Sequence, residues 1–248
     1  MKKIMLITGG SRGIGAATAI LAAKKGFAVC INYLNNSSAA GAVADAINKD
    51  GGTAITCQAD ISVESDVISL FKELDSKLGK LHTLVNNAGI LETQSRLDAM
   101  DAARLSRVIT ANVTGSFLCA REAVRRMSTK YGGLGGSIIN VSSVAARTGS
   151  PNEYIDYAAS KGAIDAMTIG LSKEVATENI RVNAVRPGFI YTDIHARGGE
   201  PGRVDRLKDA IPMKRGGQPE EVATAILWLA SDEASYITGT FIDIAGGR

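Results

Sequence analysis

The chain has 248 residues, of which 45% are apolar, and its 28 Lys and Arg residues outnumber its 25 Asp and Glu residues by only three. This ordinary apolar content and small net charge exclude a globally disordered chain, and so small a basic excess argues against nucleic acid as a partner. No apolar run approaches the ~18 residues that a membrane-spanning helix needs, so no membrane partner is expected either.

Short aliphatic runs alternate with helical stretches along the whole chain, and no linker separates one part from another. The order strand, helix, strand implies right-handed crossovers between parallel strands, with helices covering both faces of the sheet. We therefore predict an α/β fold, a single-domain Rossmann-type doubly wound parallel sheet of about seven strands that occupies residues 1–248. The predicted strands cover 3–8, 27–33, 53–58, 82–86, 136–142, 180–186 and 240–244, and the predicted helices cover about 13–26, 37–50, 63–79, 101–130, 155–178 and 218–230.

The beginning of the chain and its cysteines indicate a cytoplasmic protein. The apolar stretch Ile4–Ile7 ends at Thr8, which is too short for the ~7–15 residue core of a secretion signal. Cys30, Cys57 and Cys119 are odd in number, lie far apart and form no C-x-x-C motif. Such a set is typical of reduced thiols in a protein core.

The first predicted strand runs directly into a glycine-rich loop that opens a helix and reads Thr8-Gly9-Gly10-Ser11-Arg12-Gly13-Ile14-Gly15. Gly9, Gly13 and Gly15 provide turn conformations and let the backbone approach a pyrophosphate, while the helix N-terminus adds N–H donors and partial positive charge. The spacing is T-G-x-x-x-G-x-G rather than the common G-x-G-x-x-G fingerprint. A tight turn without a ligand explains one glycine but hardly three, so we predict a nucleotide-binding loop.

This glycine spacing resembles that of the short-chain dehydrogenase/reductase family, and later motifs strengthen the resemblance. Asp60 and Ile61 stand where the family places an acidic residue against the adenine ring. The segment Asn86–Gly89 follows a strand, where the family stabilises its sheet and lines the cofactor. Residues 186–192 match the P-G-x-x-x-T segment that holds the nicotinamide carboxamide. The cofactor-binding residues implied are Gly9, Ser11, Arg12, Gly13, Ile14, Gly15, Asn32, Tyr33, Asp60, Ile61, Asn87, Ala88, Gly89, Tyr157, Lys161, Pro187, Gly188, Ile190 and Thr192.

The residues near the predicted ribose site favour NADP, with NAD as the less favoured alternative. A carboxylate that selects NAD is expected about 20 residues beyond the glycines, but Tyr33 stands where NAD-dependent relatives carry Asp. Arg12 is suitably placed to meet a 2′-phosphate, and Asn32 offers a further polar contact. The interpretation of Arg12 as a solvated loop charge remains the alternative.

Tyr157 and Lys161 are four residues apart in a predicted helix and therefore share one face. Free tyrosine has a pKa near ~10, which is too high for a base at neutral pH. We expect the Lys161 ammonium to lower the Tyr157 pKa, so that the phenol exchanges a proton with a hydroxyl or carbonyl oxygen. A lone Y-x-x-x-K occurs often by chance, and its specificity here comes from the motifs around it.

Two upstream polar residues complete the family's catalytic set by resemblance. Ser143 matches the serine that polarises the substrate oxygen, although the separation from Tyr157 is one residue longer than expected and leaves Ser142 as an alternative. Asn112 lies inside a predicted helix, where asparagine is a poor helix former. The family uses an Asn there to bend the helix and hold a water that links the lysine to solvent. The predicted catalytic residues are Asn112, Ser143, Tyr157 and Lys161.

The stretch 187–217 shows no clear periodicity and is rich in Gly, Pro and charge. A loop of that length in a compact domain is usually functional, so we expect a mobile substrate lid at about 190–217. Family members of this size typically form tetramers by pairing their long helices, which implies a homo-oligomer for this chain as well.

These observations predict an NADP-dependent oxidoreductase that interconverts a secondary alcohol and a ketone, similar to glucose dehydrogenases and 3-oxoacyl-carrier-protein reductases. The partner is a small carbonyl or alcohol substrate whose identity the sequence does not give. A catalytically silent NADP-binding regulatory protein is the alternative, and retention of all four catalytic residues argues against it. His82 and His195 form no cluster with ligand spacing, so no metal site is expected.

Overall fold

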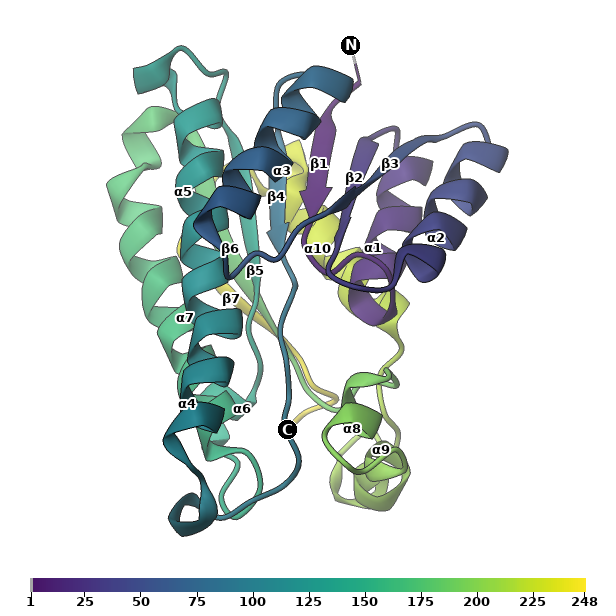
Figure 1. Ribbon diagram of the computed structural model, residues 1–248, viewed down its shortest axis with the longest axis vertical. Helices are drawn as coiled ribbons and strands as arrows, with labels where there is room; N and C mark the ends of the chain where they lie inside the picture. The colour runs from purple at the N-terminus through teal and green to yellow at the C-terminus, as the bar shows by residue number, and fades with distance from the viewer. Residues whose placement is uncertain (1) are drawn as a thin grey trace.

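Residues 2–248, described by a computed structural model, form a seven-stranded sheet with helices on both faces (Figure 1). The strand order is β3-β2-β1-β4-β5-β6-β7, and every neighbouring pair is parallel. The predicted fold class is therefore confirmed. The strands are β1 (Ile4–Ile7), β2 (Ala28–Tyr33), β3 (Thr53–Gln58), β4 (Thr83–Asn86), β5 (Gly136–Val141), β6 (Ile180–Pro187) and β7 (Phe241–Ile244).

Two apolar cores lie on opposite faces of the sheet. Leu6 and Leu84 pack in a core with α3, α5 and α7, whereas Met5 and Val85 pack in the other core with α1, α2 and α10. Strands buried on both sides explain why the strand sequences are continuously apolar rather than alternating. These six helices are α1 (Gly13–Lys24), α2 (Ser37–Lys49), α3 (Glu64–Lys77), α5 (Gly115–Met127), α7 (Ile155–Glu174) and α10 (Pro219–Ala230).

Two of the predicted helices differ from the structure in their interior or their end. The helix expected over 101–130 consists of α4 (Ala102–Ile109) and α5, joined by a π-helical turn over Thr110–Thr114. The helix expected over 155–178 ends at Glu174, and a short 3₁₀ turn leads to Asn179, whose positive φ of 62° breaks the helical path.

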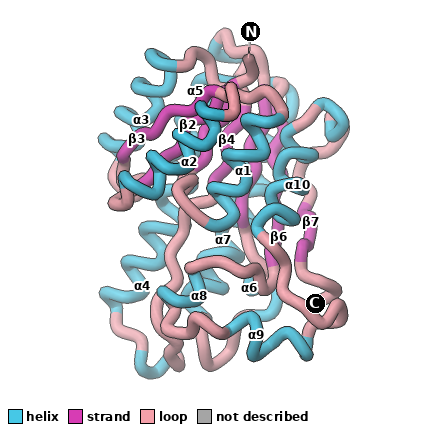
Figure 2. Tube along the Cα trace, turned by 90° about the vertical axis from the view of Figure 1, so that its right-hand side faces the viewer, coloured by secondary structure: helices cyan, strands magenta, loops and turns pink. Residues whose placement is uncertain are grey.

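The strand order reverses between β1 and β4, which opens a crevice beyond the carboxyl ends of the strands. Figure 1 shows α4 and α6 (Ala145–Thr148) on one side of these ends and α8 (Ile194–Arg197) and α9 (Arg203–Leu207) on the other, and Figure 2 shows all four in the lower part of the molecule. The last two helices lie in the stretch that has no clear periodicity in the sequence. They have only four and five residues, which is too short for a 3.6-residue repeat to emerge.

The three cysteines are free thiols buried in the core, as the sequence predicts. Cys30 and Cys57 lie on neighbouring strands with their sulfur atoms 3.3 Å apart. Burial raises the pKa of Cys119 to about 12, so almost no reactive thiolate forms there at neutral pH. Within residues 2–248, none of the helices combines the length and the hydropathy needed to cross a bilayer.

Candidate active site

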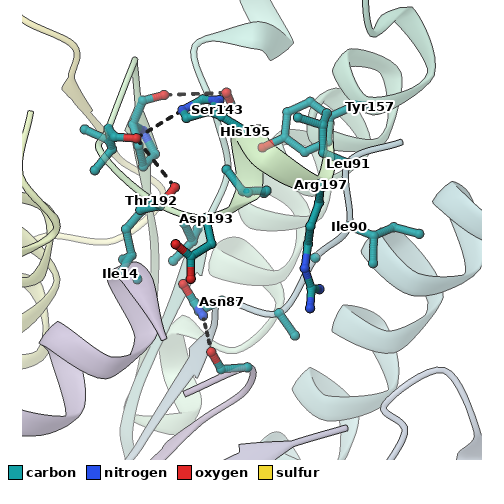
Figure 3. Close-up of a pocket in the computed structure, with 18 of the residues that line it drawn as sticks. Ile14, Asn87, Ile90, Leu91, Ser143, Tyr157, Thr192, Asp193, His195 and Arg197 are labelled. Atoms are coloured by element: carbon teal, nitrogen blue, oxygen red, sulfur yellow. Dashed lines mark hydrogen bonds between the residues drawn. The ribbon is translucent and has the colours of Figure 1, made fainter. Parts of the chain in front are cut away.

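A cavity of about 720 Å³ opens at the carboxyl ends of the strands. Its walls come from the glycine loop, the ends of β2, β4, β5 and β6, the start of α7 and the segment around α8. Figure 3 shows Ile14 and Asn87 at one end of this cavity and Ser143, Tyr157 and His195 at the other. The predicted cofactor loop and the predicted catalytic side chains therefore face one continuous space.

The glycine loop has a backbone path that side chains would obstruct. Gly9 and Gly13 have φ values of +62° and +52°, a region that favours glycine. A Cβ on Gly15 would lie 2.5 Å from the Gly9 carbonyl oxygen and 2.6 Å from Asn87 Nδ2. No side chain among the described residues caps the N-terminus of α1. The first residues of α1, Gly13 and Ile14, line the cavity, and a helix N-terminus without a side-chain cap suits an anion such as a pyrophosphate.

Thr8, at the end of β1, holds the glycine loop against the segment after β4. Its Oγ1 accepts hydrogen bonds from the backbone N–H groups of Asn87 and Ala88, both at 3.0 Å. Asn87 Nδ2 in turn donates to the carbonyl oxygens of Thr8 (2.9 Å) and Gly9 (3.1 Å). Asn87 is therefore a scaffold for the loop as well as a cavity wall. Sequence reasoning missed the role of Thr8, although its position beside the first glycine was visible.

Asn32 supports the glycine loop. The side chain is buried, its Oδ1 accepts from Gly9 N at 3.3 Å, and its Nδ2 donates to the Ala59 carbonyl at 3.1 Å. Asn32 also lines the cavity, and its contact with a cofactor stays a prediction.

Arg12 and Tyr33 line the ribose end of the cavity, as does Asp60. Desolvation lowers the pKa of Arg12, and the nearby charge of Arg197 lowers it further against the opposing effect of Asp193. Two guanidinium groups thus approach the same cavity from the glycine loop and from α8. Asp60 is fixed by Ser62, whose backbone N–H and hydroxyl donate to its Oδ1 at 2.9 and 2.6 Å.

The first turns of α7 bring Tyr157 and Lys161 together beside the end of β5. Lys161 is buried, and its Nζ lies 5.5 Å from the centre of the Tyr157 ring. The same Nζ donates a hydrogen bond of 2.7 Å to the Val141 carbonyl oxygen, the last residue of β5. A Cβ on Gly89 would lie 3.6 Å from it, so the loop after β4 closes over the ammonium.

The structure separates the two serines that the sequence leaves as alternatives. Ser142 Oγ donates to Asp165 Oδ1 at 2.6 Å and points away from the tyrosine. Ser143 Oγ lies 3.5 Å from the Pro187 carbonyl oxygen and accepts from Ala145 N at 3.1 Å, and the same side chain is near enough to the Tyr157 hydroxyl to act on its pKa. The geometry therefore places Ser143, and not Ser142, beside the phenol.

The expected lowering of the Tyr157 pKa does not occur in this arrangement. Burial raises the pKa of Tyr157 to about 12, and only the hydrogen bond from Ser143 opposes this effect. Burial also lowers the pKa of Lys161 to about 8, against the charge of Asp165. The physical reason is that the Lys161 ammonium points at the Val141 carbonyl and not at the phenol oxygen. Tyr157 is consequently protonated at neutral pH.

Asn112 lies at the centre of the π-helical turn between α4 and α5 and is fully buried. Its Oδ1 accepts from Ile90 N at 2.7 Å, and its Nδ2 donates to Ile90 O at 3.0 Å and to Ser160 Oγ at 3.1 Å. These bonds tie the helix to the loop after β4 and to α7. The helix distortion that the sequence predicts at this residue is present as a π turn, a form frequent at functional sites.

The segment after β6 lines the middle of the cavity through Pro187, Gly188, Ile190 and Thr192. A Cβ on Gly188 would lie 2.9 Å from Ala245 Cα, so glycine allows the two backbones to approach. Thr192 lies against the glycine loop, because a Cβ on Gly13 would be 3.2 Å from Thr192 Cγ2.

Two further features of the site were missed from the sequence. A buried ion pair joins Arg104 on α4 to Asp156, with Arg104 Nε 2.7 Å from Asp156 Oδ2. Asp156 Oδ1 also accepts from the backbone N–H of Tyr157 at 2.9 Å. The second feature is His195, which was considered only as a metal ligand and which lines the cavity from α8. Pairing across 52 residues leaves no local pattern that would have revealed the ion pair.

Comparison with known proteins agrees with this geometry. A family model described as Enoyl-(Acyl carrier protein) reductase matches residues 9–248. An uncharacterized oxidoreductase of Escherichia coli (strain K12), YgfF, is 62% identical over 245 residues, which is 99% of each chain. A 3-oxoacyl-[acyl-carrier-protein] reductase of Synechocystis sp. is 41% identical over 99% of this chain and 96% of its own length.

A solved structure extends the agreement to three dimensions. A Serratia marcescens short-chain dehydrogenase/reductase, crystallised as a double mutant, superimposes with a TM-score of 0.90 and is 33% identical, covering 99% of this chain and 97% of that one. The chain belongs to the short-chain dehydrogenase/reductase family. It is therefore an oxidoreductase that acts on CH–OH or carbonyl groups with a nicotinamide cofactor.

Proposed function

We propose that this short-chain dehydrogenase/reductase interconverts a secondary alcohol and a ketone with NADP(H), and that Tyr157 is its general acid and base. One observation carries the proposal: Tyr157, Ser143 and Lys161 converge on the cavity that the glycine loop also enters. An acid, a second hydrogen-bond donor and a buried cation at one point suit charge development on a carbonyl oxygen.

The roles follow from what each group can donate or hold. A substrate carbonyl oxygen accepts hydrogen bonds from Ser143 Oγ and the Tyr157 hydroxyl, and the protonated phenol supplies the proton when the ketone is reduced. A bound nicotinamide cofactor supplies or accepts the hydride. Lys161, held by the Val141 carbonyl with its Nζ 5.5 Å from the centre of the Tyr157 ring, keeps a buried cation near the phenol, and Asn112 fixes the loop and helix around it. General acid catalysis of this kind contributes about 10²–10⁴-fold to a rate.

The charges around the cofactor loop support NADP over NAD. Arg12 and Arg197 bring two cations to the cavity, and Tyr33 at the end of β2 provides no carboxylate to accept a ribose hydroxyl. A 2′-phosphate relieves the repulsion between these cations, whereas a hydroxyl does not. The remaining cofactor contacts are the residues given above, with Asn32 in a supporting role.

Residues 190–217 are proposed to form the substrate lid. Contacts with the loops opposite hold this segment in place: Arg203 Nη1 lies 3.0 Å from Glu153 Oε1, and Gln94 Nε2 donates to Glu200 at 2.6 Å. The hydrogen bond between Gln94 and Glu200 is exposed and costs little to break, whereas the Arg203 side chain is buried and has to regain water when the segment opens.

We also propose that the enzyme is a cytoplasmic homotetramer. Three free buried thiols suit a reducing compartment. Leu105 and Ile109 on α4 and Phe117 on α5 are exposed at helical spacing, and such a stripe suits helix pairing between subunits. Light scattering after size-exclusion chromatography tests this: Phe117→Glu is expected to reduce the mass of the assembly, and an unchanged mass contradicts this interface.

The activity is tested with a panel of ketones, including a 3-oxoacyl thioester, and the corresponding alcohols, with NADPH and NADH followed by absorbance. Turnover with NADPH that is lost in Tyr157→Phe supports the proposal, and equal rates in the two proteins contradict it. Arg12→Ala is expected to weaken NADPH binding much more than NADH binding. Equal losses would refute the 2′-phosphate contact. The alternative of a catalytically silent cofactor-binding protein is not favoured, because this chain retains all four predicted catalytic residues.

A further inference from the structure

His195, the second residue of α8, lines the cavity and is held in one tautomer. Its side chain is only 8% exposed, and its Nε2 lies 3.0 Å from the Ile190 carbonyl oxygen. A carbonyl oxygen only accepts, so Nε2 carries the proton and Nδ1 holds a lone pair. Burial lowers the pKa of His195, with Arg203 acting in the same direction, which keeps the ring neutral at pH 7.

The Nδ1 lone pair of His195 is buried and has no hydrogen-bond partner within residues 2–248. The other histidine, His82, has a partner for its Nδ1, which accepts a hydrogen bond from Ile4 N at 3.0 Å. A buried acceptor without a donor is costly, because it has lost water and gained nothing in return. His195 lines the cavity and belongs to the proposed lid, so a molecule that binds as this segment moves is the natural source of the missing donor.

The position of His195 points to the substrate rather than the cofactor phosphates. Figure 3 shows it at the same end of the cavity as Ser143 and Tyr157, opposite Ile14 and Asn87. The Tyr154 hydroxyl donates to the Gly198 carbonyl at 3.0 Å, and this bond holds α8 over that end. Apolar side chains surround the same end of the cavity, from Leu91, Tyr154, Phe189 and Ile194.

The charges of the cavity restrict the kind of donor. Arg12, Lys161, Arg197, Arg203 and Arg248 line it against Asp60, Glu153 and Asp193, and this excess of positive charge disfavours a cationic ammonium group on the substrate but not a neutral hydroxyl. An alcohol O–H also matches a neutral imidazole nitrogen in size and polarity.

We propose that His195 Nδ1 accepts a hydrogen bond from a hydroxyl group of the substrate, so that the enzyme selects ketones with a neighbouring hydroxyl group over simple ketones. The inference rests on the proposed function and narrows its substrate class to hydroxyketones and, in the reverse direction, the corresponding diols. A substrate without the hydroxyl leaves Nδ1 unpartnered in a water-excluded site, which reduces kcat/KM by about 10- to 100-fold.

Three ketones of similar size test this preference. 1-Hydroxybutan-2-one carries the donor, pentan-3-one replaces its hydroxyl by a methyl group, and 1-methoxybutan-2-one keeps the oxygen without its proton. The wild-type enzyme with NADPH is expected to prefer the first over both others by at least about tenfold in kcat/KM. His195→Phe is expected to reduce this preference to within about threefold, while His195→Asn, which keeps an acceptor near the Nδ1 position, retains part of it.

A binding measurement separates this inference from the activity itself. The chain has only two histidines, so the Nδ1 resonance of ¹⁵N-labelled His195 is readily assigned against His82. In the complex with NADP⁺, this resonance is expected to shift when 1-hydroxybutan-2-one is added and to stay in place with pentan-3-one.

The outcomes are distinguishable. No resonance shift, or equal wild-type kcat/KM for all three ketones, overturns the assignment of Nδ1. A His195→Phe variant that loses all three ketones equally and binds NADPH more weakly also overturns it, because Nδ1 then serves the cofactor or the fold. A resonance shift without turnover of any ketone supports the binding site and contradicts the proposed function instead.

Discussion

The buried ion pair between Arg104 and Asp156 offers a strong test of how the active-site helix is positioned. The side chains are 9% and 1% exposed, and Asp156 is the second residue of α7, directly before Tyr157. Arg104 Nη1 also donates to the Thr93 carbonyl at 2.6 Å. Arg104→Met therefore leaves a buried carboxylate with the Tyr157 N–H as its remaining partner, and it removes the bond that ties α4 to the loop after β4.

The expected loss of stability follows from this burial. Breaking a buried pair on one side costs about 3–5 kcal/mol, because the remaining charge is uncompensated. Arg107 on the same helix provides a matched control, since its pair with Glu92 is exposed at 55% and 23%. Arg107→Met is expected to cost at most about 1 kcal/mol. Urea unfolding followed by circular dichroism measures the free energy of unfolding of both variants.

The second half of the test removes both charges. Arg104→Met combined with Asp156→Leu is expected to recover much of the loss, since apolar replacement of a whole buried pair is often neutral. The kcat of Arg104→Met is expected to fall as well, because Asp156 Oδ1 accepts from Tyr157 N. Equal losses of stability in Arg104→Met and Arg107→Met would refute the reasoning.

Three other changes follow from the same geometry. Gly15→Ala is expected to abolish cofactor binding, measured by isothermal titration, because its Cβ would lie 2.5 Å from a carbonyl oxygen. Gly41→Ala, with open space around it on α2, is expected to stabilise the folded protein by about 0.5–1 kcal/mol, measured by thermal melting. Ser143→Ala is expected to lower kcat with little change in melting temperature. Ser142→Ala is expected to lower the melting temperature with little change in kcat, since Asp165 loses a donor at 2.6 Å. An equal kcat loss in both variants contradicts this assignment. The Lys161 pKa of about 8 lies below the ordinary 10.5, so between these two pH values the unfolded chain holds a proton that the folded chain has lost. The free energy of unfolding of the wild type is therefore expected to rise with pH across this window, relative to that of Lys161→Met, by up to about 3 kcal/mol. A constant difference between the two proteins would contradict the burial effect.

The fold could be predicted from the sequence because local signals and topology agree. The glycine loop between Ile7 and Gly15 links the first strand to the first helix, and β4 and β5 carry the next polar motifs at their carboxyl ends. A parallel sheet brings these ends to one edge, so the approximate site follows from strand order alone. The four-residue spacing likewise places Tyr157 and Lys161 on one helix face.

The details of the site depend on contacts that no local pattern records. The Tyr157 pKa moves upward because burial outweighs the effect of Ser143, and the direction of Lys161 Nζ depends on the Val141 carbonyl of a distant strand. Asn32 resembles a free polar residue in the sequence, yet its amide is occupied by Gly9 and Ala59. Spacing sets which residues are near, whereas hydrogen-bond partners decide what each of them does.

Single-turnover reduction of a ketone by NADPH, with enzyme in excess, measures whether the Tyr157 hydroxyl delivers the proton. We expect Tyr157→Phe to slow this step by about 10²–10⁴-fold while NADPH affinity and melting temperature stay close to those of the wild type. A Tyr157→Phe enzyme that reduces the ketone within a factor of a few of the wild-type rate would contradict it.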